Sequence, residues 1–499
     1  MLREIIKKEV RDQLLSLRLM LSFLLVLVLM SANALLFQAE YRHQLADYSR
    51  DVSLNLAAVA RNASSGYPLF TAFSWGSGDQ SIYRRPNPLS FVAEGHDKDL
   101  PNAFKINAFR LMAPEFTLRG NPLLWRFDSL DWAFIVTVLL SFTAIVLVYD
   151  AVNGEKQRGT LRLIMSQSVS RATILLGKYL SAVIVLLLPL TAGVLLNLLI
   201  MVLSSAVRLD ADHAWRVVIS YLLSLVYISI FVLLGLFLSA RSKIPVVALV
   251  TGLLAWVLLI VVIPAAGNLI ARGLVRLPAE DRIEQDAERA YGEAAEAYNQ
   301  RHPHPDNWIM SGRWSPGEPL VRAFEAHQAW GRVFQAWQDS KIAQVKWGRK
   351  IASFSPAGLL NEALESTIES GITDYENFQK SARRYQQELA SYVDRKYPLD
   401  KVSPLNRETT DPVIARMKLD FESIPKFEDR QAPASEAAGP VLRSAAILAL
   451  INVVLFAAAE SQTSDLRPQT RDRLSELGTN SVRLEITAHS QGPSERSDV

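Results

Sequence analysis

Six long apolar segments restrict the fold of this chain more than any other feature. A transmembrane helix needs about 20 mostly apolar residues, and each segment reaches or nearly reaches that length. Several begin or end with Trp or Tyr, which are enriched at membrane interfaces. The segments cover residues 19–37, 132–149, 179–203, 215–238, 244–269 and 441–459. We therefore predict an all-α polytopic membrane protein with six transmembrane helices.

Composition excludes several classes of function. Of the 499 residues, 49% are hydrophobic and 21% are charged, and the net charge is only +3. No basic tract indicates a nucleic-acid partner, and the absence of Cys rules out disulfides and thiolate metal sites. The centres of the six segments contain no ionisable side chain, whereas proton-driven and voltage-driven proteins bury such groups in their helices. An energy source outside these helices is therefore expected.

The distribution of Lys and Arg predicts the orientation. Cations are enriched in cytoplasmic loops. They gather in the N-terminal segment, in the connection 150–178 and in the tight link that carries Arg241 and Lys243. We therefore expect a multi-pass protein with both termini in the cytoplasm. Residues 2–17 also carry an apolar helical stripe beside three cations, which predicts an interfacial helix; a solvated N-terminus is the alternative. The first apolar segment continues past Ala32-Asn33-Ala34, so we do not expect cleavage there.

The predicted segments follow from these assignments. They are 1–18 (interfacial helix), 19–37 (first span), 38–131 (extracytoplasmic loop region), 132–149 (second span), 150–178 (cytoplasmic coupling segment), 179–203, 215–238 and 244–269 (third to fifth spans), 270–440 (helical extracytoplasmic domain), 441–459 (sixth span) and 460–499 (cytoplasmic tail, partly disordered).

The longer outer region shows helical periodicity. Ile283, Ala287, Ala290, Ala294 and Ala297 recur every three or four residues. A second stripe contains Tyr375, Phe378, Ala382, Tyr385, Leu389 and Tyr392. Both patterns predict long helical hairpins. An irregular aromatic helix lies between them, and its rings would line a substrate path, grip a partner or, as we favour, pack in the core. Gly and Pro punctuate 38–131, which indicates loops and short strands.

The connection 150–178 combines an acid, a glycine and several cations. The acid is Glu155, the glycine is Gly159, and the cations include Arg158, Arg162 and Arg171. Glu155 stands near a helix start, where a negative charge is favourable, and Gly159 permits a bend. A short helical element joined rigidly to two spans can dock into a partner's groove. The alternative is an ordinary cytoplasmic loop.

The runs Glu155-Lys156-Gln157-Arg158-Gly159-Thr160-Leu161, Ser168-Val169-Ser170-Arg171 and Gly177-Lys178-Tyr179 resemble the signature of ABC-2-type export permeases. Ser168 stands where that family often has Pro. Residues 83–89 and 354–359 are similar to a subgroup with long outer loops, related to copper-site maturation permeases. The resemblance implies that 150–178 contacts a separate cytoplasmic ATPase. The coupling residues that it implies are Glu155, Arg158, Gly159, Thr160, Leu161, Arg162, Ser170 and Arg171. It also implies a second permease subunit, a bacterial inner-membrane location and contact with membrane lipid.

The expected function is therefore the permease subunit of an ATP-driven exporter. No cofactor is expected on this chain, because ATP and Mg would bind the partner ATPase. The chain shows no P-loop and no metalloprotease or hydrolase motif, so we do not expect an enzyme. A membrane-anchored scaffold that binds an extracytoplasmic partner without transport is the alternative. The sequence does not identify the cargo.

Overall fold

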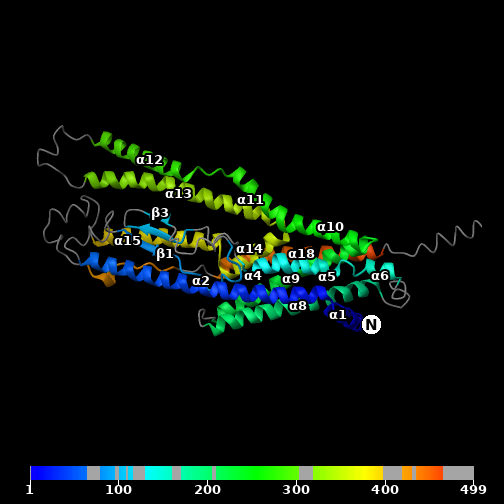
Figure 1. Cartoon of the computed structure of the whole chain (residues 1–499). Coiled ribbons are helices and arrows are strands. Elements are labelled where there is room, and N and C mark those ends of the chain that lie inside the picture. The colour runs from blue at the N-terminus through cyan, green and yellow to red at the C-terminus, as the bar shows by residue number, and fades with distance from the viewer. Residues whose placement is uncertain are drawn as a thin grey trace, which may run out of the picture.

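The computed structural model describes residues 2–64, 79–95, 101–107, 111–115, 130–159, 170–204, 210–302, 318–396, 419–429 and 434–464. These residues form an elongated, mostly helical molecule (Figure 1). Six helical stretches are long and apolar enough to cross a membrane: Leu17–Ala63, Trp132–Arg158, Arg171–Leu203, Ala211–Arg241, Pro245–Leu274 and Ala438–Gln462. The predicted all-α polytopic class with six spans is confirmed.

Two of the six spans contain a short π-helix. The elements of the membrane part are α1 (Leu2–Leu14), α2 (Leu17–Ala63), α4 (Trp132–Phe134), η3 (Ile135–Leu140), α5 (Ser141–Val148), α6 (Asn153–Arg158), α8 (Arg171–Leu203), α9 (Ala211–Arg241), α10 (Pro245–Val257), η4 (Leu258–Val262), α11 (Ile263–Leu274) and α18 (Ala434–Ser464). The π-helices are η3 in the second span and η4 in the fifth.

The remaining elements gather at one end of the molecule, except α14, which lies at the boundary. They are β1 (Gln80–Tyr83), β2 (Ala103–Ile106), β3 (Leu111–Glu115), α12 (Glu280–Arg301), α13 (Glu318–Ala352), α14 (Pro356–Ile368), α15 (Ile372–Lys396) and the 3₁₀ turn η5 (Phe421–Ser423). We call β1–β3, α12, α13, α15, η5 and the end of α2 the distal domain. α1, α6 and α10 lie toward the opposite end (Figure 1).

The first span differs from its predicted bounds. Residues 38–63, expected to be loops, continue α2 as one helix of 47 residues. This stretch contains no Gly or Pro to end the helix. Tyr41, Val59 and Ala63 are buried along it. At about 1.5 Å per residue, α2 is roughly 70 Å long and extends far beyond a bilayer. Its C-terminal end belongs to the distal domain, where Val59 and Ala63 join the core.

The spans are joined by buried polar contacts as well as by apolar packing. Asn197 Nδ2 on α8 donates to Asn33 Oδ1 on α2 at 2.6 Å. Asn33 Nδ2 donates in turn to the carbonyl of Leu130 at 2.5 Å. Asn452 on α18 accepts from Ser229 on α9 at 2.6 Å. Such bonds bring helices together where no water competes. They fix the register of neighbouring spans.

The distal domain has its own core. The strands form one antiparallel sheet in the order β1-β2-β3. Its buried face meets α15, where Phe104 of β2 packs 5.3 Å from Phe378 between ring centroids. Val59 at the end of α2 and Ile342 on α13 belong to the same cluster. The hairpin of α12 and α13 lies alongside, with Arg301 paired to Glu325.

α14 was predicted within the outer domain, but it packs among the spans. Its buried residues belong to the membrane core, together with those of α9. Ser355, the N-cap of α14, donates its hydroxyl to the carbonyl of Leu259 in η4. Leu259 is 14 residues along the fifth span from Pro245, about 21 Å at the helical rise. Since the hydrocarbon layer is about 30 Å thick, α14 begins inside the membrane.

The other end of α14 is fixed by two polar side chains. Asn87 donates to the carbonyls of Ile368 and Glu369 at 2.8 and 3.0 Å. Arg216 at the start of α9 donates to the carbonyl of Thr367 and pairs with the Glu369 carboxylate, each at 2.9 Å. These donors satisfy carbonyls that a helix end leaves without partners. α14 is thereby held at both ends.

Candidate functional site

Those predicted coupling residues that the structure describes lie at the end opposite the distal domain, near α1 (Figure 1). Glu155 and Arg158 are in α6, and Gly159 follows it. Ser170 and Arg171 stand at the start of α8. Thr160, Leu161 and Arg162 lie outside the described residues.

The ends of the two helices follow local rules. Gly159 has φ of 74°, a left-handed conformation that glycine adopts without strain and that ends α6. Ser170 caps α8, because its hydroxyl accepts from the Thr173 amide at 3.1 Å. The side chains of Arg158 and Ser170 are exposed at these ends. They are therefore accessible to a docking protein, whereas Glu155 is not.

Glu155 is buried in an ion cluster between three helices. Its Oε1 lies 3.0 Å from Nζ of Lys178 on α8. Lys178 Nζ also lies 2.9 Å from Oε1 of Glu9 on α1. Lys8 Nζ approaches Glu155 at 3.9 Å from the exposed side. We call Glu9, Glu155 and Lys178 the ion cluster. Removing Lys178 from this buried set would leave two carboxylates without their shared cation, which costs about 3–5 kcal/mol.

Gly177 lets α1 reach the cluster. A Cβ at this position would lie 2.7 Å from Cγ2 of Ile5, closer than side-chain atoms pack. The glycine therefore permits α1 to cross α8 at close range, and the next residue, Lys178, is then within reach of Glu9. The Gly-Lys pair thus lies within α8, about two turns from its start, where α1 crosses it.

α6 is also fastened to the end of α9. The Ser239 hydroxyl accepts from the amides of Val152 and Asn153 at 3.0 and 3.3 Å. Lys156 Nζ donates to the Ala240 carbonyl at 2.7 Å. Asn153 is fully buried, and its side-chain amide has no hydrogen-bond partner among the described residues. α6 is therefore part of the packed membrane domain rather than a loose loop.

A third contact joins the first two spans at the same end. Arg18, at the start of α2, donates to the Tyr149 hydroxyl at 2.9 Å and pairs with Asp150 at 3.4 Å. Its guanidinium carbon also lies 4.8 Å from the centre of the Tyr149 ring. A displacement of α6 would thus be transmitted to α1, α2, α8 and α9 together.

Sequence reasoning selected Glu155 but did not identify its partners. Glu9 and Lys8 stand in the amphipathic N-terminal segment, and Lys178 in the Gly-Lys pair, which is the only sequence signal for the cluster. No sequence pattern indicated that the hydroxyl of Ser239 would bind α6. Among the described residues, no group of three or more His, Cys, Asp or Glu side chains could hold a metal ion.

A family model described as ABC-2 family transporter protein matches residues 3–391. The match covers α1, the coupling segment, the first five spans and most of the distal domain. No curated protein matches the chain. Proteins of this family are membrane components of ABC transporters and have no nucleotide-binding domain of their own. The predicted resemblance is confirmed at the level of the family, and the chain belongs to the ABC-2 family of transporter permeases.

Proposed function

We propose that this chain is the permease subunit of an ATP-driven exporter and that a separate cytoplasmic ATPase docks on residues 150–171. ATP and Mg would bind that ATPase. The single observation that supports this best is the attachment of α6 to α8 and α1 through the ion cluster. A partner that pushes on α6 moves several spans at once.

The positions of the side chains suggest a division of roles. Arg158 and Ser170 are exposed and would meet the ATPase, together with the neighbouring Arg171. Glu155 is a positioning residue, because its carboxylate is occupied by Lys178. Thr160, Leu161 and Arg162 remain candidates from the resemblance alone. The alternative of a scaffold without transport is not favoured by membership of a transporter family.

Membrane orientation and assembly are part of the same proposal. Arg241 and Lys243 stand in the short turn between α9 and α10, beside α6, and this cluster of cations supports a cytoplasmic position for that end. Both termini would then be cytoplasmic, in a bacterial inner membrane. Leu24, Leu195 and Leu254 are exposed on different spans, so lipid and a second permease subunit would cover them.

Single-cysteine labelling tests the orientation directly, because the chain contains no Cys. Arg158→Cys places a thiol on the exposed face of α6, and Lys350→Cys places a matched exposed thiol on α13. A membrane-impermeant maleimide added to intact cells should label position 350 and leave position 158 unlabelled until the membrane is permeabilised. Labelling of position 158 in intact cells would contradict the proposal.

ATPase coupling needs a second measurement. Material purified through a tag on this chain, from membranes of its native host, should contain the partner ATPase and hydrolyse ATP in the presence of Mg. Arg158→Glu should remove most of that activity from the purified material while the chain itself remains folded and in the membrane. The control is Arg276→Glu, which reverses an exposed charge between α11 and α12. Equal activity in both variants would refute docking at α6.

A further inference from the structure

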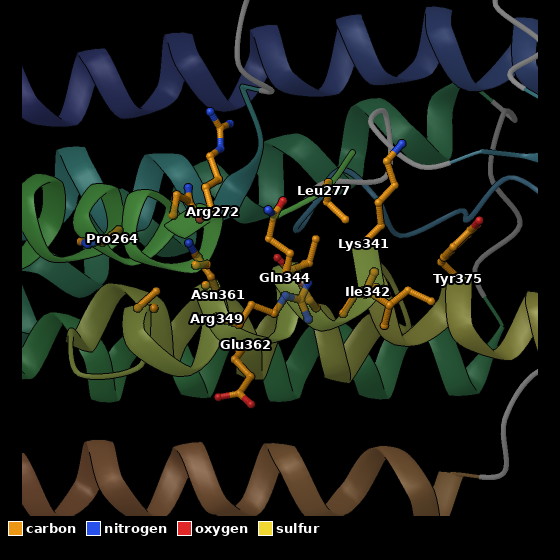
Figure 2. Close-up of a pocket in the computed structure, with 18 of the residues that line it drawn as sticks. Pro264, Arg272, Leu277, Lys341, Ile342, Gln344, Arg349, Asn361, Glu362 and Tyr375 are labelled. Atoms are coloured by element: carbon orange, nitrogen blue, oxygen red, sulfur yellow. The ribbon is translucent and has the colours of Figure 1, made fainter. Parts of the chain in front are cut away.

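A cavity of about 840 Å³ lies where the membrane spans meet the distal domain. Helices α11, α13 and α14 and the start of α12 form most of its walls, and η3 and η4 also contribute to its lining. Figure 2 shows its side chains, from Pro264 on α11 to Tyr375 on α15. We propose that this cavity binds an extended, electrically neutral peptide segment of about eight residues. The proposal depends on the cavity alone and does not require an ATPase.

The cavity is long and follows one face of α13. The residues of α13 that line it extend from Phe334 to Ala352. At the helical rise this separation is about 27 Å, and an extended chain that rises about 3.3 Å per residue covers it with about eight residues. The side chains of Arg272, Glu284 and Asn361 in the lining are exposed, so the cavity is open to a ligand from outside.

The charges of the lining cancel. Glu365 pairs with Arg349 where α14 meets α13, and Glu362 pairs with Arg443 of α18. Because cations and acids are equal in number, a ligand with a net charge of either sign would disturb the balance. A neutral ligand is therefore favoured. The cations that line the cavity are Arg272, Lys341 and Arg349, and the acids are Glu284, Glu362 and Glu365.

Polar and apolar groups are mixed along the whole cavity. On its membrane side, Asn361 and Glu365 of α14 line it together with Ile260 of η4. Toward the distal domain, Gln338 of α13 lines it together with Ile342. A phospholipid has its polar atoms at one end only and does not match this lining. A peptide does, because every residue carries a polar backbone amide and many carry an apolar side chain.

Three walls of the cavity hold side chains with unused hydrogen-bonding groups. Trp337 Nε1 on α13 is buried and has no acceptor among the described residues. The side-chain amides of Asn268 on α11 and Asn361 on α14 also bond to no other described residue. A buried donor without an acceptor is unfavourable, and a peptide carbonyl would supply one. The two Asn amides can each bond a backbone N–H and a backbone carbonyl.

The part of the cavity nearest the membrane coincides with both π-helices. Thr137 of η3 and Ile260 of η4 line it. Trp256 Nε1, just before η4, donates to the Ser141 hydroxyl just after η3 at 2.8 Å. π-Helical turns occur frequently at functional sites. Two of them beside the same cavity are an independent indication that the cavity binds a ligand.

The test uses the purified full-length chain in phosphatidylcholine nanodiscs and three pools of eight-residue peptides that carry a photoactivatable group. One pool alternates apolar with uncharged polar residues, and the other two contain several Lys or several Glu. Irradiation with the neutral pool should label α11 and α13, as mapped by mass spectrometry, and each charged pool should label them about fivefold less. No labelling by the neutral pool at saturating concentration, or equal labelling by all three pools, would overturn the proposal.

Replacing phosphatidylcholine with phosphatidylglycerol in the discs distinguishes a peptide site from a lipid site. Labelling by the neutral pool should stay the same, because the lipid does not occupy the cavity. A large loss of labelling in phosphatidylglycerol would show that an anionic lipid holds the cavity, and would refute the peptide assignment.

Trp337→Phe removes the unused donor and keeps an aromatic ring. It should reduce labelling by the neutral pool about fivefold, the effect of one lost hydrogen bond. The matched control is Trp347→Phe, which changes an exposed tryptophan of α13 outside the cavity lining and should leave labelling unchanged.

A second variant removes space instead of a donor. Asn361 is exposed, so Asn361→Trp should block the cavity without disturbing the core. The control Lys350→Trp adds the same ring on α13 outside the cavity lining. Labelling that neither cavity variant reduces would contradict the proposal. A chain without any ATPase partner would refute the proposed function and leave the peptide site intact.

Discussion

Lys178 Nζ lies 3.0 Å from the Glu155 carboxylate, and both side chains are almost completely buried between α8 and α6. The same ammonium group binds Glu9 of α1 at 2.9 Å. One cation therefore holds together three segments that are far apart in the sequence. In a transporter permease, this contact makes the short α6 part of the membrane domain that a partner would have to move.

Lys178→Met should destabilise the protein by about 3–5 kcal/mol, because two carboxylates lose their shared cation in a buried site. The measurement is the midpoint of thermal unfolding in detergent. Adding Glu155→Gln to Lys178→Met should recover part of the loss, since one unpaired charge is removed. Lys7→Met, on the exposed face of α1, is the control. A loss no larger than that of the control would show that the cluster does not contribute to stability.

Gly177→Ala should separate α1 from α8. The added Cβ would lie 2.7 Å from Ile5 Cγ2, and such overpacking costs about 1–3 kcal/mol. The double variant Gly177→Ala, Ile5→Ala should be close to wild type, because the truncated residue 5 removes the clash. The unfolding midpoints of the wild type, Gly177→Ala, Ile5→Ala and the double variant form the test. If the second change brings no recovery, α1 does not pack on Gly177.

Asn197→Leu should cost about 0.6–2 kcal/mol, the range for a hydrogen bond between membrane helices. It removes the 2.6 Å bond to Asn33 in the buried contact between α2 and α8. Asn197 also donates to the Met30 carbonyl. Asn33→Leu should cost more, since Asn33 donates to two further carbonyls, those of Leu130 and Phe91. Unfolding in a denaturing detergent measures both. The opposite order of the two losses would contradict the described hydrogen bonds.

Asp131, just before the second span, should make stability depend on pH. Burial raises its pKa to about 7, although the amides of Phe134 and Glu94 donate to it. A carboxyl whose pKa is higher in the folded protein binds its proton preferentially there. The contribution of Asp131 to the free energy of unfolding is therefore present in full below about pH 4 and is lost as the pH rises through about 7.

The matching variant is Asp131→Asn, which cannot titrate. Between pH 4 and 7 the unfolding midpoint of the wild type should fall relative to that of the variant, and the difference should stop changing above the pKa. Parallel curves for the two proteins would show that Asp131 does not titrate in this range.

Periodicity predicted the distal helices unequally well. All six residues of the stripe from Tyr375 to Tyr392 are buried in α15, because this helix lies between the sheet and the rest of the domain core. On α12 only Ile283 and Ala287 of the predicted stripe are buried, and the seam continues through Ala295 and Tyr298. Ala297 is exposed. Among the described elements, α12 packs mainly against α13, on one side. Its buried face can therefore turn about the helix axis, away from the predicted stripe.

The amino-acid sequence by itself determined the number of spans, the helical class and the short segment on which coupling is proposed. These properties depend on local features: the length of apolar runs, the spacing of side chains along a helix, and residues such as Gly159 that end one. They act within a few residues of each other, so a pattern along the chain is sufficient to predict them.

Only the tertiary structure decided where Glu155 points, how far α14 enters the membrane and which side chains enclose the cavity. Each of these brings together residues far apart in the sequence, such as Glu9 and Lys178, or Ser355 and Leu259. Local periodicity carries no information about such contacts. They depend on how whole helices pack, and packing is set by the shapes and buried polar groups of all of them together.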